Sequence, residues 1–263
     1  MNSKRLFCTI FISLCALYSS RAQDWEAMAV DCERVIWEGA DLAATNDALI
    51  RKAECYKQLG RYPDASATLS RVRMFALLPE ERRQVLYQQE LCYFLSGELN
   101  QACSIVEELD DDSPQVLLLH ALSLAYAGRY DESEIYAARF ISCDGPSARL
   151  QQLLDLYASH PVPRSSTAAM ALSFLPPCGH IYNGRPAEGL LSAGLNAAAL
   201  GFTVANLLGG YWITGLLGGG ILLNYTFMGG QQRNAALVEM VNNDAALEFG
   251  DRVRDFLSET SKQ

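Results

Sequence analysis

The sequence predicts an all-α protein in two parts, a helical repeat array followed by a transmembrane helical hairpin. A glycine-centred pattern recurs in the first half, and charged residues almost vanish between 165 and 230. The chain has 263 residues, a formal charge of −9 and 50% hydrophobic residues, so it is too apolar for a disordered chain. With 30 acidic against 21 basic residues, it lacks the cationic stripe that phosphate recognition needs, and no nucleic acid partner is expected.

Residues 1–22 have the pattern of a signal peptide. Lys4 and Arg5 precede an apolar run from Leu6 to Leu17, and Ser20-Arg21-Ala22 supplies a small-x-small ending suited to cleavage. An uncleaved N-terminal anchor is the alternative. Both interpretations export the rest of the chain, so we expect the first domain, residues 23–160, in the periplasm.

Three segments, residues 53–65, 92–102 and 121–133, share a pattern of a turn glycine, a large residue two positions later and a small residue five positions later. Their glycines, Gly60, Gly97 and Gly128, are 37 and 31 residues apart and so average 34. This spacing resembles the tetratricopeptide repeat family, which implies stacked antiparallel helix pairs. Glu90 departs from the pattern, because the other two segments have a small residue, Ala53 or Ala121, seven positions before the glycine.

Small residues in these segments are expected to let the paired helices approach closely. They are Ala53, Ala65, Ala102, Ala121 and Ser133. We expect a preceding helix over residues 25–41 and a closing helix over residues 147–159.

The family resemblance implies a concave binding surface on the inner helices of the array. Family spacing places on or near it Glu54, Lys57, Tyr87, Leu91, Phe94, Leu118, Leu122 and Tyr126. Alternatively, Leu91, Leu118 and Leu122 pack in the core of the array and do not form a binding surface. The acidic loop at residues 107–112 lacks the alternating ligands and turn glycine of a calcium loop, so no metal is expected there.

Six cysteines follow the predicted signal peptide, and an oxidising compartment permits disulfides between them. Cys92 and Cys103 fall on the two helices of one repeat, and Cys32 would face Cys55 on the next helix. We therefore predict the pairs Cys32 with Cys55 and Cys92 with Cys103. Each cysteine has the alternative of being a small buried apolar residue.

Residues 161–187 are predicted to be a linker and hairpin entry, and residues 188–232 a two-helix transmembrane hairpin. The uncharged stretches Gly189–Leu208 and Tyr211–Met228 are each long enough to cross a hydrocarbon core of about 30 Å. Tyr211 and Trp212 at the tip suit a membrane interface. A buried soluble hairpin is the alternative. The C-terminal region, residues 233–263, is predicted to be a helical tail on the same side as the repeats.

Small residues recur at every fourth position of the first span, which predicts a smooth face for helix packing. The predicted packing residues are Gly189, Ala193, Ala197, Gly201, Ala205 and Gly209, opposed by Gly215 and Gly219.

The hairpin entry, residues 175–185, reads LPPCGHIYNGR. Pro176, Gly179, Tyr182, Gly184 and the later Gly189 resemble the entry of small two-helix membrane modules of bacterial envelope proteins, and Pro177 replaces a glycine of that pattern. The resemblance implies membrane association and no known chemistry. Cys178 and His180 lack the further ligands that a metal site needs.

These patterns favour a noncatalytic, membrane-anchored protein that acts as a scaffold or adaptor for an envelope protein on its concave face, with no cofactor. The alternatives are a membrane oligomer or pore built on the small-residue stripe, in which the chain pairs with copies of itself, and an enzyme centred on Cys178 and His180. The sequence contains no triad, phosphate loop or paired carboxylate motif.

Overall fold

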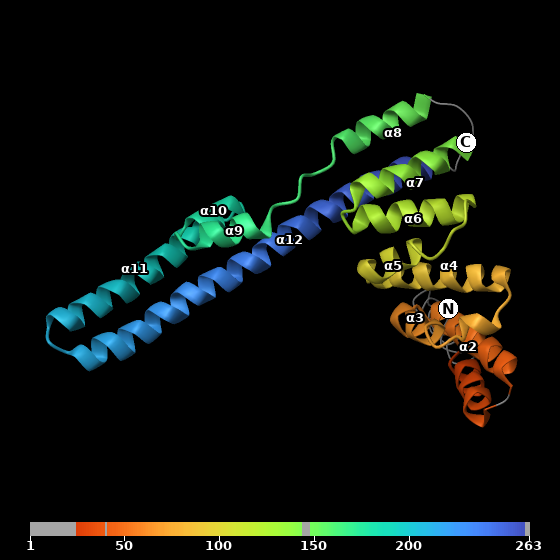
Figure 1. Cartoon of the computed structure of the whole chain (residues 1–263), viewed down its shortest axis with the longest axis horizontal. Coiled ribbons are helices and arrows are strands. Elements are labelled where there is room, and N and C mark those ends of the chain that lie inside the picture. Colours follow the sequence, from red (N-terminus) through yellow and green to blue (C-terminus); the bar gives the residue numbers. More distant parts are fainter. Residues whose placement is uncertain (1–24, 40, 144–147, 261–263) are drawn as a thin grey trace, which may run out of the picture. The chain divides into compact units, whose positions relative to one another are not determined.

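A computed structural model describes residues 25–39, 41–143 and 148–260 of the chain. Every regular element within these ranges is a helix, which confirms the all-α prediction (Figure 1). The chain divides into two compact units, residues 1–157 with 256–263 and residues 158–255. This division lies close to the predicted boundary at residue 160. The predicted signal peptide lies outside the described residues.

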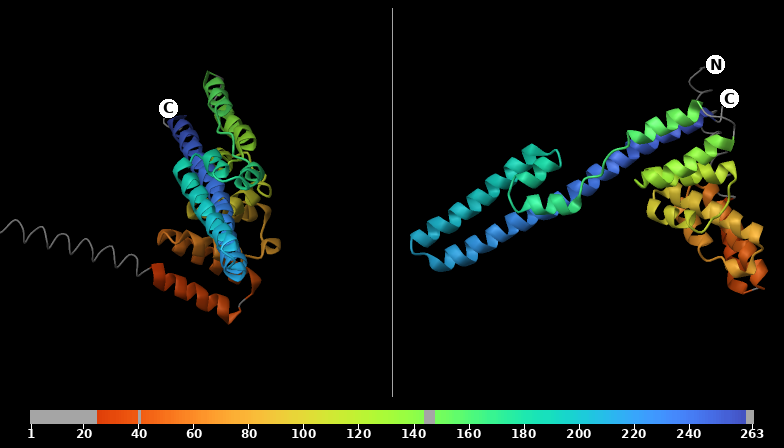
Figure 2. Two further views of the ribbon diagram at one scale, coloured as in Figure 1. Left: turned by 90° about the vertical axis from the view of Figure 1, so that its left-hand side faces the viewer. Right: turned by 45° about the horizontal axis from the view of Figure 1, so that its top comes forward.

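The first unit consists of helices that pack on one another in chain order (Figure 2). Residues 25–38 form a helix that Gly39 ends, as predicted for this segment. Helix pairs follow, and η1 (Met74–Ala76) lies between the first pair and the second. The pairs are α2 (Leu42–Gln58) with α3 (Tyr62–Leu69), α4 (Pro79–Ser96) with α5 (Leu99–Val106), and α6 (Pro114–Tyr126) with α7 (Tyr130–Cys143). The expected closing helix is α8 (Ala148–Ala158).

Glycines in the left-handed region form the turn within each pair. In each turn the residue after the glycine donates its backbone N–H to the carbonyl five positions earlier, as Arg61 does to Tyr56 at 2.8 Å. Only glycine adopts this conformation without strain, since a Cβ would crowd the backbone. The turn glycines are Gly60, Gly97 and Gly128, with φ of 71°, 78° and 77°. The glycine pattern therefore does mark the helix turns.

The small residues predicted at the helix contacts are buried. They are Ala53, Ala65, Ala102, Ala121 and Ser133, each at most 1% exposed. Leu49, Leu69 and Val85 surround the first contact, where α2, α3 and α4 meet. The Ser133 hydroxyl donates to the Ala121 carbonyl at 2.6 Å, which satisfies it inside the core.

Glu90 is fully buried where the other repeats have alanine, and its carboxylate contacts the next helix pair. His120 Nδ1 lies 2.9 Å from its Oε2, and Ser123 donates its hydroxyl to Oε1 at 3.0 Å. His120 is also fully buried, and its Nε2 lies 3.2 Å from the Leu109 carbonyl. Buried polar groups need hydrogen-bond partners, and His120 Nδ1 and the Ser123 hydroxyl both bond the Glu90 Oε1, at 3.1 and 3.0 Å. The departure from the repeat pattern is thus a polar link between α4 and α6.

The second unit contains two short helices and a long helical hairpin. The short helices are α9 (Ser166–Ser173) and α10 (Cys178–Tyr182), so the predicted linker and entry is largely helical. The hairpin is α11 (Pro186–Leu208), a turn at Gly209 and Gly210, the π-helical η2 (Thr214–Gly219), and α12 (Gly220–Thr260). The predicted C-terminal tail is helical as far as Thr260, but it is not separate from the hairpin, because α12 continues through residue 233 without a break.

Buried asparagines join the hairpin entry to α12. Asn234 donates its side-chain amide to the Ala169 carbonyl at 2.9 Å and also to the Ser173 hydroxyl. Asn183 in turn donates to the Asn234 carbonyl at 3.3 Å. A Cβ on Gly179 would collide with the Asn234 side chain. The glycine of the entry motif therefore makes room for this network.

A third asparagine, Asn242, fixes the segment before α9. Asn242 accepts a hydrogen bond from the Arg164 backbone N–H at 2.8 Å and donates to the Arg164 carbonyl at 3.0 Å. The Arg164 guanidinium donates to the Tyr182 carbonyl at 2.8 Å, and the Tyr182 hydroxyl accepts from the Ser165 N–H at 3.1 Å. The motif tyrosine thus ties the end of α10 to the start of α9.

The contact face of the hairpin differs from the predicted stripe. Gly215 and Gly219 do lie against α11: a Cβ on Gly219 would come within 2.8 Å of the Thr203 Cβ, and one on Gly215 within 2.9 Å of Leu207. A Cβ on Gly201, however, would meet nothing within 4 Å. Four residues advance a helix by about 40° beyond a full turn, so a strict four-residue stripe winds off the contact face.

The first member of the stripe, Gly189, faces the hairpin entry instead, where a Cβ would come within 3.0 Å of Pro177 and His180. Gly189 is buried and Ala193 is half-buried, and the later members Ala197, Gly201, Ala205 and Gly209 are exposed. The face continues instead through Asn196, whose side chain accepts a hydrogen bond from Thr226 at 3.1 Å.

Replacing Glu90 tests the buried link. Glu90→Ala leaves His120 buried without its partner, so we expect a loss of about 3–5 kcal/mol of unfolding free energy. The measurement is the urea dependence of hydrogen exchange in peptides from α4 to α6 of the full chain. The exposed Glu108→Ala is the control. Adding His120→Leu to Glu90→Ala should restore part of the loss, and a Glu90→Ala variant as stable as the control would contradict the link.

Two matched glycine substitutions test the hairpin contact. Gly219→Ile drives a branched side chain into Thr203, which we expect to cost about 1–3 kcal/mol. Gly201→Ile points into open space and should leave the contact unchanged. Limited proteolysis of the hairpin in detergent micelles distinguishes them. Equal protease resistance of both variants, or a weaker hairpin only in Gly201→Ile, would show that the predicted stripe forms the contact after all.

Candidate binding groove

A groove lies between α2 and α4 in the first unit, with a volume of about 350 Å³. It combines an apolar floor with amide and charged side chains at its edges. Its lining comprises Ala43, Asn46, Asp47, Ile50, Ala53, Glu54, Lys57, Leu69, Ala76, Leu77, Glu81, Gln84, Val85 and Gln88.

Side-chain to backbone hydrogen bonds position the two walls. Asn46 on α2 donates to the Arg73 carbonyl at 3.1 Å and accepts from the Arg73 N–H at 2.9 Å, which fixes the segment leading to α4. Glu81 accepts from the Leu78 N–H at 2.9 Å and so satisfies an orphan donor at the start of α4. Both contacts fix the segment that leads from α3 into α4.

Lys57 links the two walls at one end of the groove. Its ammonium donates to the Gln88 Oε1 on α4 and contacts the Glu54 carboxylate on α2, each at 2.5 Å. The hydrogen bond from Lys57 lowers the pKa of Glu54. Asp47 and Glu81 add two further carboxylates to the lining. The formal charge of the lining is therefore negative, because Lys57 is its single cation.

The predicted concave-face residues are all half-buried, so each keeps part of its side chain at the surface. Glu54 and Lys57 line the groove. The rest lie outside its lining on the two following inner helices, Tyr87, Leu91 and Phe94 on α4 and Leu118, Leu122 and Tyr126 on α6. The Phe94 and Tyr126 rings meet edge to face at 5.5 Å.

Sequence reasoning missed the polar side chains that complete the groove, chiefly Gln84 and Gln88. The spacing of these residues along the helix could have indicated that they share one face. Gln84 and Gln88 stand four residues apart on α4, as Ile50 and Glu54 do on α2, so each pair projects from one face of its helix. The composition of these positions is ordinary for a solvated helix, and only the approach of the two helices makes them walls of one groove.

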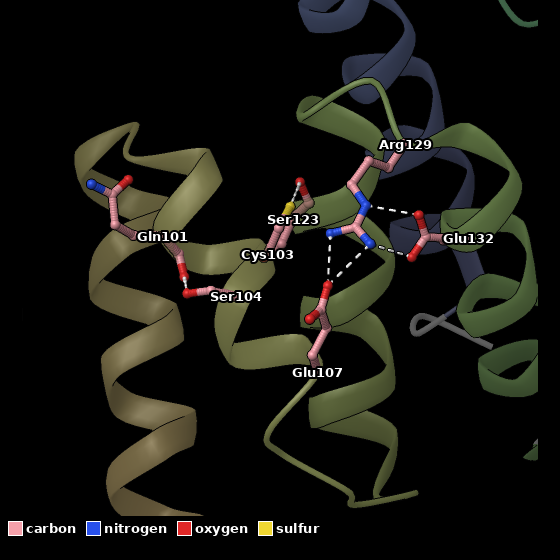
Figure 3. A network of polar contacts seen from close by, with 7 residues as sticks. All are labelled: Gln101, Cys103, Ser104, Glu107, Ser123, Arg129 and Glu132. Atoms are coloured by element: carbon pink, nitrogen blue, oxygen red, sulfur yellow. Dashed lines mark hydrogen bonds and ion pairs between the residues drawn. The ribbon is translucent and has the colours of Figure 1, made fainter.

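Arginines pair with two carboxylates of the acidic loop after α5. Arg129 donates to Glu132 at 2.5 Å and lies 3.3 Å from Glu107 (Figure 3). Arg139 reaches Asp112 at 3.3 Å. The hydrogen bonds to Glu132 raise the pKa of Arg129 above its usual value. Within the part of the chain that the structure describes, His, Cys, Asp and Glu do not gather into a group that could hold a metal ion.

The cysteines that the structure describes are thiols, so the predicted pairs Cys32–Cys55 and Cys92–Cys103 are not formed in it. Cys92 packs in the α2–α4 core, whereas the Cys103 thiol faces the Ser123 carbonyl at 3.7 Å (Figure 3). The two therefore belong to separate packing clusters. Burial raises the pKa of Cys92 to about 11, which keeps it protonated at neutral pH.

The hairpin offers a second candidate surface, which is apolar. Among the described residues, α11 is the one helix long and apolar enough to cross a membrane by length and composition. Tyr211 and Trp212 are exposed at the tip, and Glu188 and Arg233 form an ion pair of 2.9 Å at the other end. The exposed large side chains on α11 are Leu190, Leu191, Leu195, Leu200, Phe202, Val204 and Leu208, and those after the turn include Ile213, Leu216, Leu217, Ile221, Leu222, Tyr225 and Met228.

The site residues Cys178 and His180 lie together on the short helix α10 but take different surroundings. His180 is buried, and a Cβ on Gly189 would come within 3.0 Å of its Cβ. His180 therefore contributes to the packing of the hairpin entry, whereas Cys178 is half-buried.

No protein-family model, curated protein or solved structure matches this chain. The function is therefore argued from the groove and the hairpin surface alone.

The raised pKa of Cys92 predicts alkaline destabilisation. The unfolded thiol releases its proton near pH 9 and the folded one near pH 11, so unfolding free energy falls as pH rises between these values. The loss is on the order of 2 kcal/mol. In the full chain, Cys92 should become alkylated at lower urea concentrations at pH 10 than at pH 8, and exposed Cys143 should be alkylated without urea at both. Recovery of Cys92 and Cys103 as one disulfide-linked peptide would contradict this prediction.

Proposed function

We propose that this chain is a noncatalytic, membrane-anchored protein of the bacterial envelope that holds another protein in the groove between α2 and α4. The groove carries the proposal, because it is concave, preformed and lined by both apolar and hydrogen-bonding side chains. In this proposal the helix pairs are tetratricopeptide-like, as their turn glycines and small contact residues suggest, and they lie in the periplasm after export by residues 1–22.

The chemistry of the groove favours an extended peptide with a basic residue. Gln84 offers an amide donor and an acceptor, and Gln88, whose Oε1 accepts from Lys57, offers its amide N–H donors, which match groups of a peptide backbone. Within the lining, the carboxylates of Asp47, Glu54 and Glu81 outnumber the ammonium of Lys57, and Arg51 beside the lining pairs with Asp47 at 3.0 Å. A lysine or arginine of the partner would offset this excess, and charge complementarity of this kind steers binding.

The hairpin supports the anchoring half of the proposal. Residues 189–232 contain no charged residue. The 23 residues of α11 extend about 34 Å, enough for the hydrocarbon core. Polar side chains within the span have partners in the hairpin: Asn196 donates to the Ser192 carbonyl at 2.8 Å, and Asn206 donates to the Phe202 carbonyl at 2.9 Å. Satisfied polar groups are what a bilayer demands.

Photo-crosslinking tests the groove in cells. A benzophenone amino acid at exposed Gln84 should give a discrete adduct, and one at exposed Ile135 on α7 should not. Reversing the groove charge with Asp47→Lys and Glu54→Lys should weaken the adduct by about tenfold or more, because like charges then face the partner. The matched control, Glu108→Lys with Asp110→Lys, makes the same charge change in the acidic loop.

The outcomes of this experiment separate cleanly. An adduct that disappears in the groove variant and persists in the loop control supports the proposal. Equal adducts at Gln84 and Ile135, or equal loss in both double variants, would show that the groove does not hold the partner.

A further inference from the structure

The end of α9 lies beside the base of the hairpin (Figure 1). We call residues 170–175, which include exposed apolar side chains, the apolar corner. The helix buries only Ala169 and Ser173. Phe174 and Leu175, which follow it, are 60% and 69% exposed, and Met170 is 59% exposed. No charged residue occurs between Arg164 and Arg185. Large apolar side chains grouped in this way mark an interaction surface and are unusual on a face that meets water.

Contacts with α12 give the position of this corner along the hairpin. The Phe174 ring lies 5.9 Å from the ring of Phe227. Phe227 precedes Arg233 by six residues, which is about 9 Å along a helix. The Glu188–Arg233 ion pair marks the charged end of the uncharged segment. Phe174 therefore lies on the tip side of that ion pair, alongside the uncharged part of the hairpin, whereas Ala169 and Ser173 bond Asn234, which follows Arg233.

The backbone of the corner is suited to an apolar surrounding. The Ser165 hydroxyl accepts from the Ala168 N–H at the start of α9. At its end, Leu175 donates to the Leu172 carbonyl at 3.2 Å, and Cys178 donates to the Leu175 carbonyl at 2.7 Å. Irregular backbone enters hydrocarbon only when its polar groups are satisfied internally. In the turn after α9, these bonds satisfy the backbone N–H groups of Leu175 and Cys178.

We propose that the corner from Met170 to Leu175 inserts into the lipid hydrocarbon as a short wedge beside the hairpin, in the leaflet next to the Glu188–Arg233 ion pair. The inference rests on the proposed membrane anchoring. Its occupant is lipid acyl chain, because the exposed surface of the corner is continuous in depth with the apolar hairpin and offers no charged group to a protein partner. The wedge makes the anchor a three-part element: two helices and a re-entrant corner.

Tryptophan fluorescence in vesicles tests the wedge on the full chain. The chain has three tryptophans, Trp25, Trp37 and Trp212. Replacing all three with phenylalanine and adding Phe174→Trp gives a single reporter at the corner. The vesicles contain phosphatidylcholine and phosphatidylglycerol, with bromine on the acyl chains either near the glycerol or near the methyl end. Leu175→Trp is a second reporter, in case Phe174→Trp disturbs the contact with Phe227.

Matched reporters make the result decisive. Phe75→Trp, at a 77% exposed phenylalanine of η1, should not be quenched by either lipid. The chain that keeps only Trp212 reports the hairpin tip. We expect bromine near the glycerol to remove more than about half of the corner emission, since shallow insertion extends about 5–10 Å below the headgroups.

The outcomes distinguish the wedge from the membrane anchoring on which it rests. Quenching at the corner with none at Phe75→Trp supports the wedge. Quenching of Trp212 with none at either corner reporter overturns the wedge and leaves the anchoring intact, as would be the case if another protein or a second copy of the chain covered the corner. Absence of quenching at both the tip and the corner overturns the anchoring and the wedge together.

Discussion

The left-handed glycine turn is the constraint on which the helical architecture depends. The same hydrogen bond, from the residue after the glycine to the carbonyl five positions earlier, closes helix ends in both units. It occurs at Gly60, Gly97, Gly128, Gly184 and Gly210. Because the turn is short and its geometry is fixed, each helix that follows must fold back on the one before it. The groove, the hairpin entry and the hairpin tip all lie next to helices that these turns orient.

Much of this architecture could be predicted, because a glycine at a turn or an alanine at a helix contact meets a local steric requirement that depends little on residues distant in the sequence. The turn positions and the buried small residues belong to this class. The groove does not, since the contact of Lys57 with Gln88 joins residues 31 positions apart on separate helices. The hairpin stripe failed for a geometric reason. A four-residue period differs from the 3.6 residues of a helical turn, so the stripe does not follow the contact face: Gly189 meets Pro177 and His180 of the entry, and Gly201 meets nothing within 4 Å.

The entry motif has a packing explanation that the sequence pattern alone did not contain. Gly179 leaves space for Asn234, Gly189 leaves space for Pro177, and Tyr182 bonds the chain ahead of α9. These residues therefore form one small core around the polar network of Asn183 and Asn234. A motif of this kind specifies how two helices enter a hairpin, and the chemistry of the surrounding side chains is free to vary.

The Glu90–His120 link also limits how the array can change over time. Repeat proteins commonly grow by copying a unit, because each unit contacts only its neighbours through interchangeable surfaces. Here the contact between α4 and α6 is not interchangeable. A helix pair inserted between them would leave the buried Glu90 without an imidazole on one side and the buried His120 without a carboxylate on the other. A helix pair inserted at that joint would therefore need new polar partners for both Glu90 and His120.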